Sequence, residues 1–419
     1  MKDLNASKER DILRRLAAEV AALAQLPVQN ERRKLWAAMN DLHPERPMLW
    51  INEIPWGEFE DHVDELRTVC TNEQLRVLEK ELRRKIFVAT HLKTDEVVEG
   101  VYRLNISLEN FMYGVETDEV QIEQGAASIQ SHHYKPVIAE MEDIEKIKIP
   151  AVYHNVNETM RRMTFCDALF GDILPVVVTG VRCHFFTAWD DLVRWTGVTE
   201  ALIDLHERPE YIHALMRRVT DSYLARMKQF EEQNLLSPSG TLLRVASGAA
   251  GFTNELPRSD SLPGKVFLAD QWGGATAQIF VDVSPEMHAE FALQYEKEIM
   301  SLCGLNYYGC CEPVHNKMHL LATVPNLRKI SISPWCDVKL ASEQAGTRYV
   351  FSHKPSPAIF AESGFSAERA RMDIRRRLEN SGEHACEFIM KDISTIRNDV
   401  QRMIDWCSLA YDECLQWAN

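Results

Sequence analysis

The sequence lacks the features that mark membrane-spanning and secreted proteins. Its best apolar run, ILPVVVTGV at residues 173–181, is far shorter than the roughly 18 residues that a membrane-spanning helix needs. The amino-terminal stretch, residues 1–20, is charged and amphipathic, and it has no apolar core before a small-residue cleavage site, as a secretory signal would. We therefore expect a cytoplasmic protein with no membrane segment.

Clusters of basic residues are also missing. The chain has 47 Lys and Arg against 62 Asp and Glu, a formal net charge of −15, and its basic residues stand among acidic neighbours. Because a nucleic-acid surface needs a basic patch, this composition argues against nucleic-acid binding. We expect small molecules or proteins as partners.

The ten cysteines show neither a disulfide framework nor a CxxC spacing, and no HExxH sequence is present. Scattered cysteines in a long chain indicate reduced thiols rather than disulfides. One stretch stands out, NYYGCCEPVHNK at residues 306–317, where two adjacent cysteines, a carboxylate and a histidine follow an apolar run. Such a stretch has the side chains for metal binding or for acid–base chemistry.

The chain divides into an amino-terminal helical extension, residues 1–44, and a larger domain, residues 45–419. Apolar residues at three- and four-residue spacing predict helices within 7–41. These helices could pack against a neighbouring subunit in a homo-oligomer, or they could close the end of the larger domain. We find no internal repeat.

In the larger domain, short β-rich runs alternate with helix-length segments, which predicts an α/β fold, a (β/α)₈ TIM barrel with an N-terminal helical extension. A doubly wound open sheet is the alternative, but it would show a Gly-rich phosphate turn after its first strand, and MLWINEIPW has none. The eight predicted strands are residues 48–54, 97–107, 174–180, 265–270, 305–311, 328–333, 348–352 and 386–390.

In a barrel, residues just past the carboxyl end of each strand meet at one mouth. Asp270 and Glu312 are the expected general acid or base, because a carboxylate at the end of an apolar strand tends to have a shifted pKa. The alternative for Asp270 is a structural ion pair, for example with Arg182. We expect Cys311, Glu312, His184 and Asp270 to face one cavity.

Thiolate, carboxylate and imidazole together suit Zn²⁺, and a catalytic zinc has three protein ligands and one open position. The expected set is Cys311, Glu312 and an imidazole from another strand end, His184 or His353. The alternative is that Cys311 is a small core residue.

Trp272 and Tyr308 are expected to line a substrate pocket, together with Tyr307 and Trp335, although aromatic residues at these positions could equally belong to the core. His184 or Lys354 would hold a charge on the substrate.

Three segments resemble the uroporphyrinogen decarboxylase superfamily, which includes zinc- and corrinoid-dependent methyltransferases. They are LPVVVTGVRCHFFTAWDDLVRWTG at 174–197, LADQWGGATAQIFVDVSPEMHAEFALQYEKEIMS at 268–301, and LNYYGCCEPVHNKMHLLATVPNLRKISISPWCDVKLASEQAG at 305–346. The resemblance implies a (β/α)₈ barrel over about residues 45–415.

The sequence departs from both chemistries of that superfamily. The decarboxylases have an arginine-rich substrate loop near the amino terminus, whereas EIPWGEFEDHVDEL, after the first strand, is acidic. The thiol methyltransferases have His-x-Cys where this chain has Tyr308-Gly309-Cys310, so the usual zinc ligands cannot be carried over intact.

The resemblance implies a methyltransferase that moves a methyl group between a small O-, N- or S-methylated substrate and a corrinoid carried by a partner protein, with zinc assisting. A decarboxylase or lyase that acts without a cofactor on a small carboxylated substrate is the alternative. A non-catalytic binding protein is the third.

Overall fold

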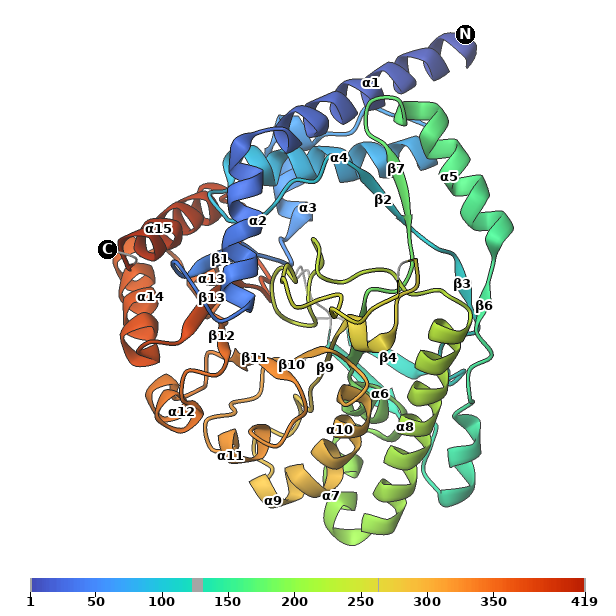
Figure 1. Ribbon diagram of the computed structural model, residues 1–419, viewed down its shortest axis with the longest axis vertical. Coiled ribbons are helices and arrows are strands. Elements are labelled where there is room, and N and C mark those ends of the chain that lie inside the picture. Colours follow the sequence, from blue (N-terminus) through green and yellow to red (C-terminus); the bar gives the residue numbers. More distant parts are fainter. Residues whose placement is uncertain (1, 123–130, 263, 418–419) are drawn as a thin grey trace.

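The computed structural model describes residues 2–122, 131–262 and 264–417, and its centre is a parallel sheet of seven strands (Figure 1). Every neighbouring pair in this sheet is parallel. In spatial order the strands are β1 (Met48–Ile51), β13 (Ala385–Met390), β12 (Val350–His353), β11 (Leu327–Ile332), β10 (Leu305–Tyr308), β9 (Trp272–Ala275) and β8 (Cys183–Phe186).

An eighth barrel strand, β2 (Tyr102–Asn105), pairs in parallel with β7 (Val176–Thr179). Residues 180–182 join β7 directly to β8, so that 176–186 is one extended run with a bend. The described strands β1 and β2 are not paired with each other. The carbonyl of Leu49 in β1 instead accepts from the backbone N–H of Asp95. The chain is therefore an α/β protein with a TIM-barrel-like domain, as the sequence predicts.

Helices lie on the outer side of the sheet (Figure 1). Their bounds are α3 (Trp56–His62), α4 (Glu73–His91), α5 (Val156–Phe170), α6 (Ala188–Thr196), α7 (Val198–Glu207), α8 (Pro209–Glu232), α9 (Pro285–His288), α10 (Gln294–Met300), α11 (Met318–Leu321), α12 (Val338–Ala345), α13 (Ala358–Ala361), α14 (Ala367–Ser381) and α15 (Gln401–Trp417). In the part of the chain that is described, no helix combines the length and apolar character needed to cross a membrane.

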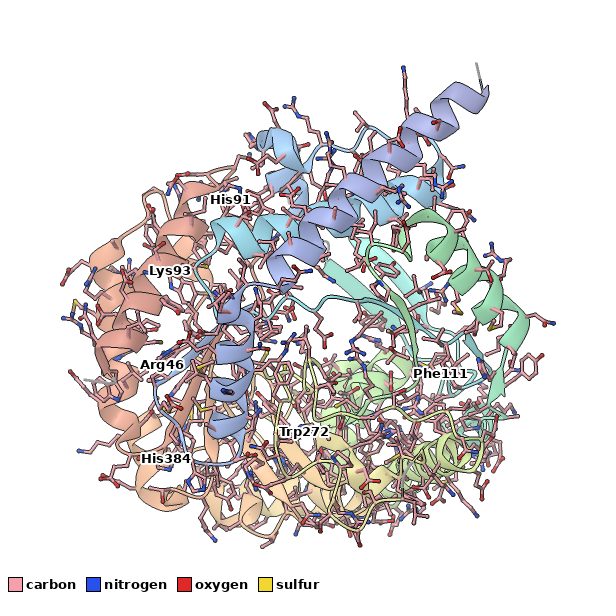
Figure 2. The ribbon with its side chains drawn as sticks, turned by 45° about the horizontal axis from the view of Figure 1, so that its top comes forward. Arg46, His91, Lys93, Phe111, Trp272 and His384 are labelled. Carbon is pink, nitrogen blue, oxygen red and sulfur yellow. The ribbon has the colours of Figure 1, made fainter. Side chains whose placement is uncertain are left out.

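Two helices precede the barrel, α1 (Lys2–Ala24) and α2 (Pro27–Asn40). Helix α1 packs on α4 and α5, and α2 lies across β1 and β13. The side chain of Asn40 donates to the backbone of Ala250 and Phe252, both at 2.8 Å. Arg46, between α2 and β1, and Lys93, just after α4, each lie 5.1 Å from the ring centre of Tyr411 in α15 (Figure 2). These contacts connect both segments to α15.

The predicted strand at 265–270 is wrong. Residues Leu268–Asp270 form a 3-10 turn, and β9 begins only at Trp272. Asp270 makes this turn by accepting from the backbone of Phe267 at 3.0 Å and from the hydroxyl of Ser261, because short acidic side chains stabilise turns. The strand itself was missed because glycine is rare in strands. Gly273 and Gly274 are needed there because Cys303 and Tyr307 leave no room for side chains.

A long connection with short strands of its own lies between β2 and β7. It contains β3 (Leu108–Glu109), the hairpin of β4 (Asp118–Ile122) and β5 (Ser131–Lys135), and β6 (Tyr153–His154). The sequence places ASIQSHHYKPVI, residues 127–138, over the mouth; residues 127–130 lie outside the described part, and β5 packs against α6. Since α6 follows the carboxyl end of β8, this hairpin is on the same side as the mouth.

The inner side of the sheet carries a buried ion pair. Lys329 and Glu387 are fully buried, and their side chains are 2.8 Å apart. The inner segment, residues 239–256, packs against them, with the backbone of Ala249 donating to Glu387 at 3.3 Å and Lys329 donating to Ala250 at 3.3 Å. Buried charges are tolerated only when paired and hydrogen-bonded, so this pair fixes the inner segment to the barrel.

The first prediction concerns this pair. Lys329→Met leaves the carboxylate of Glu387 buried without its partner, so the free energy of unfolding should fall by about 3–5 kcal/mol. Urea unfolding measures the change. Combining Lys329→Met with Glu387→Met should recover much of the loss, because no unpaired charge is then buried.

A matched control is Arg161→Met, which breaks an exposed ion pair with Glu158 and should change stability little. The account of the barrel interior is contradicted if Lys329→Met is as mild as this control.

Candidate functional site

The stretch NYYGCCEPVHNK lies at the mouth of the barrel, as the sequence predicts. Strand β10 ends at Tyr308, and Gly309 follows with a φ of +95°. A side chain there would be strained in this left-handed conformation and would lie 3.1 Å from the Cβ atom of Ser331. Glycine therefore lets the chain leave the strand sharply, so that Cys310 and Cys311 need not point to opposite sides.

Four side chains meet past the ends of β10 and β13, and we call them the thiol–lysine cluster: Cys310, Cys311, Lys391 and Asp392. The two sulfur atoms are 3.6 Å apart. The ammonium group of Lys391 lies 3.4 Å from the sulfur of Cys310, 3.9 Å from that of Cys311 and 3.0 Å from the carboxylate of Asp392. The sulfur of Cys311 also lies 3.8 Å from the carboxylate of Asp392.

The cluster favours a thiolate at Cys310. The hydrogen bond with the Cys311 thiol lowers the pKa of Cys310 to about 7, and the charge of Lys391 adds to this effect against the influence of burial. The same shared proton, together with burial, raises the pKa of Cys311 well above its ordinary value. Burial alone would lower the pKa of Lys391, but the two sulfurs and Asp392 raise it. Near neutral pH Cys310 therefore exchanges between thiol and thiolate, while Cys311 stays a thiol and Lys391 stays an ammonium group.

Glu312 holds the backbone of Cys310. It is fully buried, and its two oxygens accept from the hydroxyl of Thr276 at 2.8 Å and from the backbone N–H of Cys310 at 2.9 Å. Both oxygens are thus engaged by the protein. The arrangement makes Glu312 a residue that positions Cys310, whereas the sequence interpretation made it an acid, a base or a metal ligand.

Lys354 and Tyr307 lie on the inner side of the barrel. The ammonium group of Lys354 donates to Tyr307 and to the hydroxyl of Ser352, both at 2.7 Å. Burial lowers the pKa of Lys354 to about 7. The hydroxyl of Ser247, in the inner segment, donates to the carbonyl of Gly309 at 3.0 Å and lies 3.2 Å from the hydroxyl of Tyr307. The inner segment therefore reaches the turn that carries the cysteines.

Tyr308 does not face the mouth. Because neighbouring residues of a strand point to opposite sides, Tyr308 points outward to the helices while Tyr307 points inward. Its hydroxyl donates to Glu296 at 2.8 Å and lies 2.5 Å from Nε2 of His288. Burial raises the pKa of Glu296 to about 8. A π-helical turn, η4 (Ala289–Leu293), separates His288 from Glu296 in the chain. No short motif in the sequence indicates this buried group.

His184 and Asp270 also lie away from the cluster, which corrects the expectation of a shared cavity. His184 is buried on the outer side of β8, where it stacks on Phe230 and its Nε2 lies 2.8 Å from Gln271. Burial lowers its pKa to about 4. Asp270 precedes β9 and therefore lies at the amino-terminal end of the strands. The error arose because the run at 174–180 continues to Phe186 and because β9 begins after Asp270.

Trp272 is on the inner side of the barrel but at the amino end of β9. It is fully buried and donates to the carbonyl of Gly251 at 2.9 Å (Figure 2). It packs under the inner segment and does not line the mouth. Of the residues predicted to bind substrate or line its pocket, Lys354 and Tyr307 lie on the inner side close to the cysteines.

The predicted zinc ligands do not come together. His184 is bonded to Gln271, and Glu312 is bonded to Thr276 and to the backbone of Cys310. Within residues 2–122, 131–262 and 264–417, no group of three or more His, Cys, Asp or Glu side chains is arranged to hold a metal. The ammonium group of Lys391 lies where a cation shared by the two sulfurs and Asp392 would lie. The donor set therefore does not fit the three-ligand zinc site that the sequence suggests.

Two further charged residues border the cluster. Glu53, just past β1, accepts from the backbone N–H of Asp392 at 3.0 Å and pairs with Arg244 at 3.2 Å. Glu53 lies near the end of the first predicted strand, residues 48–54, whereas Arg244 comes from the inner segment, which has no regular pattern. Its place at the mouth could not have been predicted.

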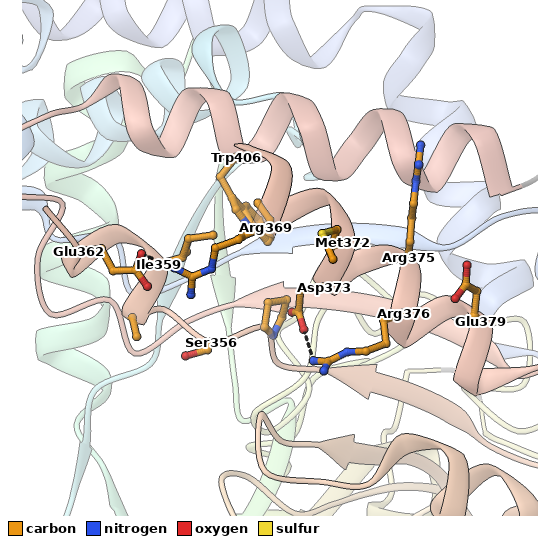
Figure 3. A pocket seen from close by; sticks show the side chains of 13 residues that line it. Ser356, Ile359, Glu362, Arg369, Met372, Asp373, Arg375, Arg376, Glu379 and Trp406 are labelled. Atoms are coloured by element: carbon orange, nitrogen blue, oxygen red, sulfur yellow. Dashed lines mark hydrogen bonds and ion pairs between the residues drawn. The ribbon is translucent and has the colours of Figure 1, made fainter. Parts of the chain in front are cut away.

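A hollow of about 610 Å³ lies elsewhere, between α13, α14 and α15 (Figure 3). Its charged groups neutralise one another: Arg369 pairs with Glu362 at 2.6 Å, and Arg376 pairs with Asp373 at 2.7 Å. It lies on the outside of the barrel and lacks the thiol–lysine cluster. We therefore take the cluster as the candidate active site.

Comparisons with known proteins add information on the fold. No family model and no curated protein matches the chain. Among solved structures, the chain is similar to a methyltransferase from Methanosarcina mazei, with 12% sequence identity and a TM-score of 0.51 over 91% of this chain and 98% of the other. At this identity the likeness establishes the fold.

The second prediction tests whether Lys391 takes the place of a metal. Removing its ammonium group in Lys391→Met should raise the affinity of the cluster for zinc by about tenfold or more, since each 1.4 kcal/mol of lost repulsion is worth about tenfold. A zinc titration with a competing chelator measures the affinity.

Lys93→Met, which removes an exposed lysine paired with Asp412, should bind zinc as the wild type does. Stoichiometric zinc in purified wild type that disappears in Cys311→Ser would contradict this interpretation and support the predicted zinc site.

Proposed function

We propose that the chain is a methyltransferase that moves a methyl group between a small O-, N- or S-methylated compound and a corrinoid carried by a partner protein. The observation that carries the proposal is the thiol–lysine cluster at the carboxyl ends of β10 and β13, where barrel enzymes perform their chemistry. The likeness in fold to a solved methyltransferase and the resemblance in sequence both support this class of reaction.

The cluster meets the chemical need of such a transfer. When a methyl group leaves oxygen, nitrogen or sulfur, that atom keeps the electron pair and needs a proton or a nearby positive charge. Lys391 supplies a fixed positive charge in a partly buried setting, which favours developing negative charge. Cys310, with a pKa of about 7, can give up or take a proton near neutral pH.

The direction of transfer decides the role of Cys310. In demethylation, its thiol protonates the departing heteroatom. In the reverse direction, its thiolate removes the proton from the accepting group. The corrinoid supplies the nucleophile or the methyl donor. The zinc predicted from the sequence takes no part in this transfer, because the described side chains at the mouth do not fit the predicted three-ligand site.

The remaining residues hold this arrangement in place. Glu312 accepts from the backbone N–H of Cys310, and the hydroxyl of Ser331 donates to the carbonyl of Cys310 at 2.7 Å. These two bonds hold the backbone that carries the thiol, and catalysis by proton transfer requires a positioned group.

The third prediction concerns Cys310. With a reduced free corrinoid as acceptor and a panel of methoxy, methylamino and methylthio compounds, Cys310→Ser should lower the rate of demethylation by about 10²–10⁴-fold, the usual contribution of a general acid. The rate of the wild type should fall above pH 7 as the Cys310 thiol ionises. Formation of the methylated corrinoid, followed by absorbance, measures the rate.

Two variants check the cause. Lys391→Met should move the falling limb to higher pH, because a lost cation raises the thiol pKa, while Cys303→Ser, which removes a buried thiol before β10, should leave the profile unchanged. Full activity in Cys310→Ser contradicts the proposal. Release of carbon dioxide from a carboxylated compound, without methyl transfer, would favour the decarboxylase alternative.

A further inference from the structure

The two cysteines of the cluster differ from most other thiols of the chain. Seven of the ten cysteines are buried, while Cys183, Cys310 and Cys311 are partly exposed. Burial raises the pKa of Cys183 to about 11, which leaves it protonated near neutral pH. Reactivity of a cysteine requires access and a thiolate, so only the adjacent pair combines these conditions with a second thiol within reach.

The geometry brings the pair close to bond formation. The sulfur atoms are 3.6 Å apart, and a disulfide needs about 2.05 Å, so the side chains must move together by roughly 1.5 Å. Gly309 places a left-handed turn directly before the pair, and no secondary structure holds residues 309–317. Glu312 and Ser331 hold only the backbone of Cys310, so the two sulfurs can approach by rotation of their side chains.

We infer that Cys310 and Cys311 are a dithiol that reacts with low-molecular-weight disulfides and closes to a disulfide between adjacent residues. Nothing in methyl transfer requires this second reaction, and the inference rests on the geometry of the two thiols alone. It does not depend on the proposed function.

The exchange takes two steps. The thiolate of Cys310, held beside Lys391, attacks one sulfur of the disulfide RSSR, forms a mixed disulfide and releases RS⁻. The released RS⁻ takes the proton of Cys311, and the thiolate of Cys311 then attacks the sulfur of Cys310 and releases a second RS⁻. This second RS⁻ takes from solvent the proton that Cys310 gave up on ionising. Counted from two thiols, the protein loses two electrons and two protons, and RSSR becomes two thiols.

The disulfide should also be readily reduced. Adjacent Cα atoms are about 3.8 Å apart across a trans peptide, whereas disulfides usually join Cα atoms about 4.4–6.8 Å apart. The closed ring is therefore strained, and strained disulfides are the easily reduced ones. Oxidation removes the Cys310 proton that demethylation needs, so the couple would also switch the proposed activity off and on.

The experiment uses the full chain, reduced and then treated with oxidised glutathione above the ordinary thiol pKa of about 8.5. Intact-protein mass spectrometry should show the loss of two hydrogens, with the disulfide mapped to the peptide that contains both cysteines. Dithiothreitol should restore the original mass. No methyl substrate is present, so the outcome is independent of the proposed function.

Variants separate closure from simple adduct formation. In Cys311→Ser, and equally in Cys311→Ala, the reaction should stop with one glutathione attached to Cys310. Cys183→Ser should behave as the wild type does. The inference is overturned if wild-type protein accumulates the glutathione adduct at Cys310, if the two cysteines stay reduced, or if they form disulfides between chains.

Discussion

Two thiols at the mouth of the barrel share one proton, and an ammonium group lies beside both. The sulfur of Cys310 is 3.6 Å from that of Cys311 and 3.4 Å from the nitrogen of Lys391. These contacts bring the ionisation of Cys310 close to neutral pH. Demethylation uses its thiol form, and disulfide exchange uses its thiolate form. In the order of the sheet, β10 and β13 are separated by β11 and β12, so their ends meet only because the sheet curls into a barrel.

The barrel interior provides a rigid base for this arrangement. Lys329 and Glu387 pair without access to water, and Lys354 and Tyr307 form a second polar layer above them. The inner segment satisfies groups in both layers through Ala249, Ala250 and Ser247. A polar interior of this kind is stable only when each member has a partner, which explains why an irregular segment fills the space. The turn at Gly309 rests directly on it.

Much of the fold could be predicted because strands and helices leave periodic patterns. Seven of the eight predicted strands overlap observed ones, and NYYGCCEPVHNK lies at the mouth. The failures were local. β9 contains two glycines that only tight packing explains, and Asp270 closes a turn before it. Tyr308 and His184 were assigned to the wrong side because a shift of one residue reverses the face of a strand. The contact of Lys391 with the sulfurs depends on the curl of the sheet, which no short motif encodes.

The most direct test of the account is the ultraviolet absorbance of the thiolate, titrated from acid to alkaline pH in the wild type with Cys310→Ala as the reference. The difference between the two proteins reports the ionisation of Cys310. The account predicts a midpoint near pH 7, which moves upward in Cys311→Ala because the shared proton is lost. A midpoint near the ordinary thiol pKa of about 8.5 in the wild type, unchanged in Cys311→Ala, would contradict it.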